Sequence, residues 1–205
     1  TVYPSCGGVV PNPSPGTDLA DAVFDALEAG ANVAADYLQR AVKTNETGRA
    51  AALVLGLSAL AGPLASDTPI SLLEVGASAG LNLRLDRFAY LDGGGLIDAG
   101  GLIDDDAVLL GGDAGSPVRL APEWRPTAPT LSPWTVGERV GLDPHPADPT
   151  RPEVALRLRS YLWPDQTARR IRLNGAIKLA GQVPADLIET DDTAATLKQL
   201  LGERA

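Results

Sequence analysis

The sequence contains no methionine, one cysteine and one histidine among its 205 residues, and only 4% of the residues are aromatic. The lone Cys6 cannot build a disulfide framework, and with His145 it leaves only carboxylates as metal ligands, so we expect no metal site. No apolar run reaches the roughly 18 residues of a membrane span. A signal-peptide pattern is also absent, so we expect a cytoplasmic protein that does not bind membranes. Because the sequence starts at Thr1 and lacks methionine, we expect a processed or excerpted polypeptide.

Basic residues are scarce relative to acidic ones. There are 17 Lys and Arg residues against 26 Asp and Glu residues, which gives a net charge of −9. A chain of this charge lacks the positive field that sequence-independent binding to nucleic acid requires, so bulk nucleic-acid binding is not expected. Its length suits one domain with a substantial core.

The order of the hydrophobic patterns predicts an α/β fold. Helical periodicity dominates residues 1–66, which we interpret as an N-terminal helical cap. Residues 67–205 carry three apolar runs, each leading to a helical pattern, and these predict the first three βα units of a Rossmann-like parallel sheet, a partial one. The predicted strands are Ile70–Val75, Arg139–Leu142 and Asp186–Glu189. Ile70–Val75 is continuously apolar, which is typical of a strand buried on both faces.

An insertion interrupts this pattern at about residues 91–134. It begins with a Gly/Asp-rich segment in which GGLID occurs twice, at 94–98 and 100–104, and which we expect to be an acidic loop. The runs AVLL and PVRLA flank GGDAGS further on, and this arrangement predicts a hairpin. Before the insertion, an apolar stripe from Leu81 to Phe88 predicts a helix that opens at the glycines.

The turn after the first strand is rich in glycine and offers a mount for a ligand or a nucleophile. Its sequence runs from Glu74 through Gly76, Ser78 and Gly80 to Asn82. The turn lacks the G-x-G-x-x-G spacing of a dinucleotide site and the Lys-Ser/Thr pair of a P-loop. Backbone amides at such a turn are nevertheless available to a ligand, and glycine lets the ligand approach.

One interpretation of this turn is a serine hydrolase. Residues 76–80 match the G-x-S-x-G nucleophile elbow with Ser78 as the nucleophile. The base would be His145, oriented by Asp113 or Asp143, and this follows the chain order of such hydrolases. The competing interpretation is that His145 is an exposed loop residue.

A second interpretation is a methyl-donor site. Glu74 with the three residues at 76, 78 and 80 resembles the acid-x-Gly-x-Gly-x-Gly loop of such folds, with serine at the middle position. Asp143 ends the second strand, where a carboxylate can accept hydrogen bonds from two ribose hydroxyls. Asp191 or Asp192, just past the third strand, is a candidate for a base contact, with a helix cap or turn as the alternative role.

Four segments together resemble an uncharacterised bacterial domain-of-unknown-function family, DUF2332. They are TNETGRAAAL, LLEVGASAGLNLRLDRFAY, GLDPHPADPTRPE and YLWPDQTARRIRL. The family is similar in fold to adenosylmethionine-dependent methyltransferases. The resemblance implies that S-adenosylmethionine is the cofactor and that its pocket is lined by Glu74, Gly76, Ser78, Gly80, Asn82 and Asp143.

The same resemblance suggests further pocket residues and a partner. Thr44, Asn45, Glu46 and Arg49 of TNETGR would close the pocket from the helical cap, while Trp163, Asp165 and Gln166 of WPDQ are weaker candidates. Family members resemble longer proteins whose fourth strand would lie beside the first. Without that strand, residues 70–75 form an exposed sheet edge, and we expect pairing into a homo-oligomer there.

The sequence thus leads to three hypotheses. The first is a methyltransferase-like protein that binds S-adenosylmethionine and aligns it with an unknown acceptor, with no catalytic residue assigned. The second is the Ser78 hydrolase, and the third is a binding or scaffold protein without turnover.

Overall fold

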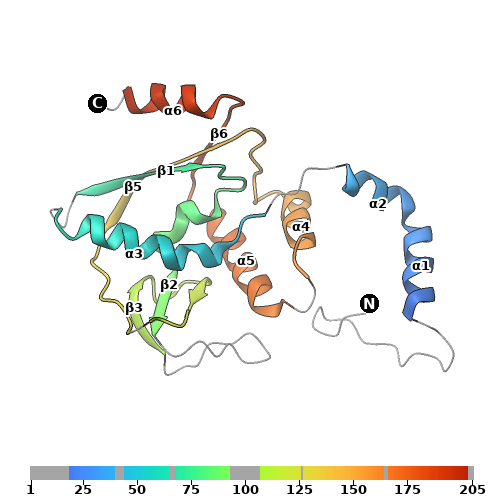
Figure 1. Cartoon of the computed structure of the whole chain (residues 1–205), viewed down its shortest axis with the longest axis horizontal. Coiled ribbons are helices and arrows are strands. Elements are labelled where there is room, and N and C mark those ends of the chain that lie inside the picture. Colours follow the sequence, from blue (N-terminus) through green and yellow to red (C-terminus); the bar gives the residue numbers. More distant parts are fainter. Residues whose placement is uncertain are drawn as a thin grey trace.

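The computed structural model describes residues 19–39, 44–64, 68–92, 107–125, 127–163 and 166–202 (Figure 1). Its centre is a three-stranded parallel sheet in the order β1-β5-β6. The strands are β1 (Pro69–Val75), β5 (Thr135–Asp143) and β6 (Asp186–Glu189). Leu73 pairs with Val140, and Asp143 pairs with Glu189. The carboxyl ends of all three strands therefore lie at one edge of the sheet.

The helices follow the sequence periodicity closely. Helix α1 ends at Ala29 and α2 begins at Ala31, so Gly30 separates two helices. The segment from Asn45 is extended rather than helical at first, and a 3₁₀ turn precedes the next α-helix. The helices are α1 (Leu19–Ala29), α2 (Ala31–Leu38), η2 (Thr47–Arg49), α3 (Ala50–Ala61), η3 (Leu81–Arg87), α4 (Pro152–Ser160), α5 (Thr167–Ala180) and α6 (Thr193–Gly202).

The segment after Gly80 is helical, as predicted, but it forms a 3₁₀ helix, η3, rather than an α-helix. Arg84 in its middle has non-helical backbone angles, φ −106° and ψ 18°. Its guanidinium reaches back to the carbonyl of Gly80 at 2.6 Å and across to that of Val183 at 2.9 Å. A side chain that ties two distant segments together from inside the turn fixes the kink, which hydrophobic periodicity alone does not reveal.

A second, smaller sheet replaces the predicted hairpin. Its order is β3-β2-β4, with β2 (Ala89–Asp92) between β3 (Val108–Gly112) and β4 (Arg119–Leu120). The two predicted hairpin strands pair with β2, one antiparallel and one parallel, instead of with each other. The hairpin prediction was wrong because β2 precedes the predicted insertion boundary at residue 91 and supplies the pairing partner.

The core lies between the central sheet, η3, β2 and the helices α3 and α5. It contains Leu81, Phe88, Tyr90 and Val118, which are at most 1% exposed. Buried apolar residues of β1, α3 and α5, among them Leu72, Val54 and Leu173, also belong to this core. One hydrophobic core therefore packs against both sheets.

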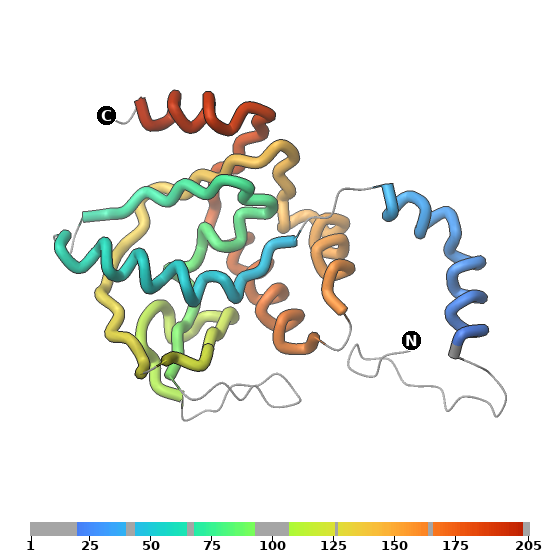
Figure 2. The backbone as a smooth tube through the Cα atoms, viewed as in Figure 1, coloured from blue at the N-terminus to red at the C-terminus, as the bar shows by residue number. Residues whose placement is uncertain are grey.

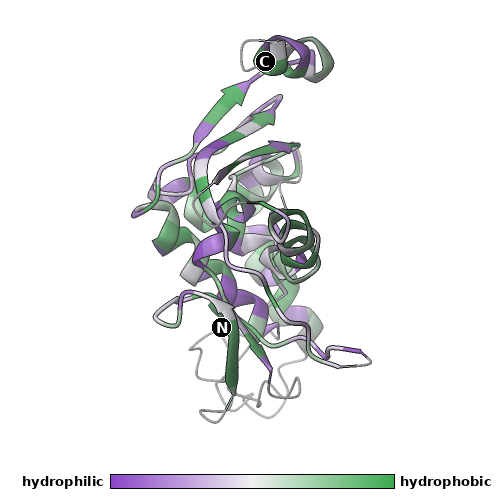
Figure 3. Ribbon diagram, turned by 90° about the vertical axis from the view of Figure 1, so that its left-hand side faces the viewer, coloured by the Kyte–Doolittle hydropathy of each residue, from purple (hydrophilic) through white to green (hydrophobic). Residues whose placement is uncertain are grey.

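Strand β1 is less buried than its apolar sequence predicts. Only Leu72 is fully buried, and Val75 is 57% exposed. Helix α6, beside the C-terminal label in Figure 3, stands clear of the helices on the opposite face and has no buried residue. The prediction that β1 is buried on both faces was wrong, because the described helices pack closely against one face only.

Some predictions concern residues outside the described ranges. These are the two GGLID copies with their acids, Cys6 and Asp165. The division at residue 66 also stays a prediction. Within the described residues, no helix is long and apolar enough to cross a membrane.

Candidate functional site

The turn after β1 has a left-handed backbone at alternate residues. The φ angles are 70° at Gly76, 53° at Ser78 and 61° at Gly80. Glycine adopts such angles without strain, whereas serine does so at a cost. The amides of Gly76 and Ala77 both donate to the carbonyl of Leu142, at 2.8 and 3.1 Å. The turn therefore folds back over the end of β5.

Asp143, at the end of β5, holds this turn in place. One carboxylate oxygen accepts the amide N–H of Ser78 at 2.8 Å, and the other accepts that of His145 at 2.9 Å. The residue is only 5% exposed. Asp143 is therefore positioned at the predicted site, but its two oxygens contact the protein's own amides. Its assignment to ribose stays a prediction.

We expect Asp143→Ala to destabilise the fold by about 1–3 kcal/mol, because it leaves the buried Ser78 amide without an acceptor. Urea unfolding measures the loss. Asp148→Ala is the matched control, since Asp148 also accepts the amide two residues on, from Thr150 at 2.9 Å, but at an exposed position. Equal effects of the two substitutions would contradict the clamp role of Asp143.

Three acceptor atoms around this turn are buried without a hydrogen-bond partner. They are Oε2 of Glu74, Oγ of Ser78 and Oδ1 of Asn82. Unpaired buried polar atoms are uncommon in folded proteins and indicate a missing ligand or water. The Asn82 oxygen can only accept, and so can the Glu74 carboxyl when it is ionised, so a group that satisfies both in that state must donate hydrogen bonds. No single structural role explains all three positions.

Glu74 is also electrostatically unusual. Burial raises its pKa to about 7, although the Asn82 amide and the charges of Arg49 and Arg84 oppose the shift. Near neutral pH this carboxyl is half ionised. A cationic donor beside it would restore full ionisation.

The TNETGR segment packs against this turn (Figure 2). That it closes a cofactor pocket stays a prediction. Asn45 donates to the carbonyl of Ala77 at 2.7 Å, and Asn82 lies 3.5 Å from the Asn45 oxygen. Arg49 is exposed but close enough to Glu74 to influence its charge. The helical segment thus brings a second set of polar groups to the end of β1.

Glu46 connects this segment to α5. It forms ion pairs with Arg169 and, at 3.7 Å, with Arg172. Gln166 accepts from Arg169 at 2.8 Å, whereas Trp163 is 70% exposed. Of the described WPDQ residues, only Gln166 therefore joins the network beneath the site.

The buried cations near this turn were not predicted from the sequence. Arg84 is 4% exposed and contacts Gly80, as described above. Arg139 donates two hydrogen bonds to the Asp86 carboxylate, at 2.6 and 2.7 Å. The signal was an arginine between leucines in LRLDR, because a charge within an apolar run must find a partner when buried.

The residues of the hydrolase hypothesis do not form a catalytic arrangement. The imidazole of His145 lies 3.6 Å from Glu189 and is 72% exposed, while Ser78 Oγ is buried and unpaired. Asp113 belongs to the turn after β3, where it accepts the amide of Gly115. Asp143 contacts the backbone of Ser78 and His145 rather than linking their side chains.

Asp191 and Asp192 are both exposed. Asp192 accepts the amide of Ala195 at 2.9 Å and so caps α6, which is the alternative role considered above. Among the described residues, no group of three or more His, Cys, Asp or Glu could hold a metal ion.

Comparison with known proteins gives one match. No curated protein and no solved structure matches the chain significantly. The sequence model of one family, described as uncharacterized protein conserved in bacteria (DUF2332), matches residues 1–205. The match spans every segment on which the resemblance was based, so the chain belongs to this family.

Proposed function

We propose that the chain binds S-adenosylmethionine in a methyltransferase-like site at the carboxyl end of β1. The observation that carries the proposal is the cluster of buried, unpaired acceptors on Glu74, Ser78 and Asn82. The methionine part of this cofactor carries an ammonium group, which donates hydrogen bonds and is positively charged. A half-ionised carboxyl beside an amide oxygen is the environment that such a group stabilises.

The neighbouring residues also fit the cofactor. An added Cβ on Gly76 would meet no atom within 4 Å, so the backbone there is open to a ligand. Arg49, near Glu74, offers a positive charge to the carboxylate of the same methionine group. Parallel strands in the order β1-β5-β6 favour the Rossmann-like interpretation, since ligands of open α/β sheets bind at the carboxyl ends of the strands. The bound cofactor would supply an electrophilic methyl group, and these residues would hold and orient it.

The test is calorimetric titration of adenosylhomocysteine, which binds without turnover. We expect the affinity to rise between pH 6 and 7.5, because Glu74 must ionise to pair with the ammonium group, and its pKa is about 7. Glu74→Gln should weaken binding about tenfold at pH 7.5 and remove the pH dependence.

Glu138→Gln is the control, since Glu138 lies exposed on the neighbouring strand β5. Absence of binding to the folded chain at both pH values would refute the cofactor proposal. A binding or scaffold protein without turnover would then be the leading hypothesis.

A hydrolase remains the second candidate because of one observation. Ser78 has a φ of 53°, the strained backbone that a nucleophile elbow imposes on its serine. Labelling of Ser78 by a fluorophosphonate would support this function. A folded protein that resists labelling would refute it.

A further inference from the structure

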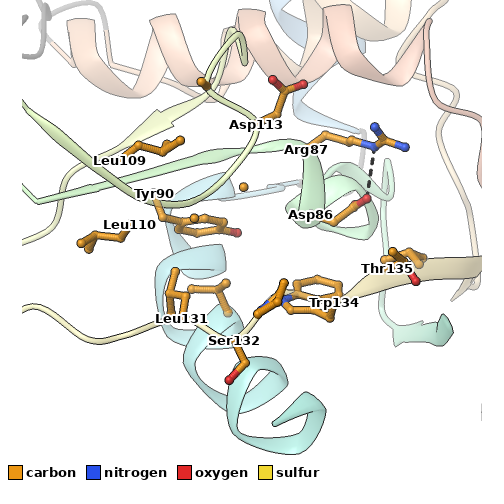
Figure 4. Close-up of a pocket in the computed structure, with 16 residues that line it drawn as sticks. Asp86, Arg87, Tyr90, Leu109, Leu110, Asp113, Leu131, Ser132, Trp134 and Thr135 are labelled. Atoms are coloured by element: carbon orange, nitrogen blue, oxygen red, sulfur yellow. Dashed lines mark ion pairs between the residues drawn. The ribbon is translucent and has the colours of Figure 1, made fainter. Parts of the chain in front are cut away.

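A second cleft lies at the opposite end of β5 from the candidate cofactor site. Its volume is about 720 Å³, within the range of small-molecule sites, and it is open to solvent along one side. The strands β2 and β3, the end of η3, the segment before β5 and Val54 of α3 line it (Figure 4). None of the residues predicted to bind S-adenosylmethionine belongs to this lining.

Hydrogen bonds and close packing hold the apolar wall of the cleft in place. The ring of Tyr90 is 1% exposed, and its hydroxyl donates to the carbonyl of Leu85 at 2.8 Å. Leu131 packs on Gly111, where an added Cβ would lie 3.0 Å from it. The amide of Ser132 donates to the Ser58 hydroxyl at 2.6 Å, which ties this wall to α3. With the half-buried Trp134, these contacts form a fixed surface for a large apolar group.

Two opposite charges lie together at one rim of the cleft. The amide of Asp113 donates to the carbonyl of Phe88, the residue after Arg87, so the two charged residues are backbone neighbours across the sheet. Figure 4 shows both at the same end, away from Leu131 and Ser132. No ion pair of the described residues joins Arg87 to Asp113.

Arg87 has guanidinium N–H groups beyond the one that faces Asp86. Its Nε lies 3.2 Å from Asp86, and its side chain is 52% exposed. Both oxygens of Asp86 already accept from Arg139, so Arg87 is the outer and weaker partner. Arg87 lines the cleft, and its remaining guanidinium N–H groups can receive a carboxylate. Asp113 uses one oxygen to accept from Gly115, which leaves the other available to an ammonium group.

The Thr135 end of the cleft is too far from the β1 turn to hold a methyl acceptor. Thr135 lines the cleft, and Asp143 clamps the turn, at the two ends of β5. A strand rises about 3.3 Å per residue, so the two positions are roughly 25 Å apart. Reacting atoms must approach to about 3–3.5 Å. A ligand of the cleft is thus independent of the proposed cofactor and of its chemistry.

We propose that this cleft binds an apolar α-amino acid. Arg87 takes the carboxylate, Asp113 takes the ammonium group, and the side chain lies on Leu131 and Trp134, with the buried Tyr90 ring behind them. An α-amino acid carries its ammonium and carboxylate groups on the same carbon atom, so it can meet two opposite charges at one rim of the cleft. An apolar body then covers the aromatic and leucine surface.

The test is titration of three probes into the full chain: L-phenylalanine, 3-phenylpropanoate, which lacks the amine, and phenethylamine, which lacks the carboxylate. Calorimetry gives the affinities. The indole N–H signals of the three tryptophans give a local readout in a ¹⁵N spectrum, with Trp134 assigned from Trp134→Phe. We expect phenylalanine to bind at least tenfold more tightly than either analogue and to shift the Trp134 signal.

Substitutions distinguish binding in this cleft from binding at the β1 turn. Arg87→Gln and Asp113→Asn should each weaken phenylalanine binding at least tenfold, and Asp113→Asn keeps an acceptor for the Gly115 amide. Arg125→Gln, at an exposed ion pair outside the cleft, should not weaken it. Glu74→Gln should also leave it unchanged, whereas loss of binding in that variant would place phenylalanine at the β1 turn and overturn the proposal. No binding at millimolar phenylalanine, or equal binding of 3-phenylpropanoate, would overturn it as well.

Discussion

Gly175→Ala should destabilise the protein by about 2–3 kcal/mol, whereas Gly56→Ala should stabilise it by about 0.5–1 kcal/mol. Both glycines lie inside α-helices, Gly175 in α5 and Gly56 in α3. Alanine is the better helix former at both positions, because glycine loses more backbone entropy on folding. The opposite signs must therefore come from packing.

The packing differs sharply between the two positions. A Cβ on Gly175 would lie 2.3 Å from the carbonyl oxygen of Pro117 and 3.1 Å from a methyl group of Val118. Val118 is completely buried just before β4, and its neighbouring backbone cannot move aside like a surface side chain. A Cβ on Gly56 meets nothing within 4 Å. Alanine at 175 thus pushes α5 away from the second sheet.

Urea unfolding of the two variants and the parent chain measures the difference. The midpoint should fall for Gly175→Ala and rise for Gly56→Ala, with similar slopes. Similar stabilities of the two variants would show that α5 does not approach the second sheet so closely.

The main sheet was predictable because local signals coincide with its elements. Asp186–Glu189 was predicted with the bounds that β6 has, and the end of β5 differs by one residue from its prediction. In each case an apolar run stops at a proline, a glycine or an acid, and a helical period follows. Such signals depend on neighbours in the sequence and need no knowledge of distant contacts.

The second sheet and the buried charges depend on distant contacts instead. Ala89–Asp92 has only four residues, and its role as the central strand follows from partners on both sides. Asp143 was predicted at the site from its position at the end of β5, but one of the two amides that occupy its oxygens, that of Ser78, comes from a turn 65 residues earlier in the chain. The rim formed by Arg87 and Asp113 likewise requires the pairing of β2 with β3, which the sequence analysis missed.

Glu74→Gln should stabilise the protein in a pH-dependent manner. Burial raises the pKa of Glu74 to about 7 from the usual 4.5, so between these values the folded chain binds more protons than the unfolded chain. Stability due to this residue is therefore fully present below about pH 4.5 and decreases as the pH rises through 7. Glutamine has the same shape but no charge, so it avoids this loss. The expected gain is roughly 3 kcal/mol at pH 8 and below about 1 kcal/mol at pH 5.

Urea unfolding of the parent chain and of Glu74→Gln at several pH values measures this gain. Glu138→Gln is the control and should not change the difference in stability between pH 5 and pH 8. A constant gain from Glu74→Gln across this range would contradict the raised pKa. Destabilisation by Glu74→Gln at pH 8 would instead show that the carboxylate is satisfied within the protein.

The same residue links stability to the proposed function. A carboxyl that destabilises the fold when ionised is expected where a site is built for a ligand rather than for the fold. An ammonium group bound beside Glu74 would favour its ionised form, so adenosylhomocysteine should stabilise the parent chain more at pH 7.5 than at pH 6. In Glu74→Gln the stabilisation by adenosylhomocysteine should be small and equal at the two pH values. If the ligand instead stabilises both proteins equally, it binds away from Glu74, and the unpaired acceptors at the end of β1 serve another donor.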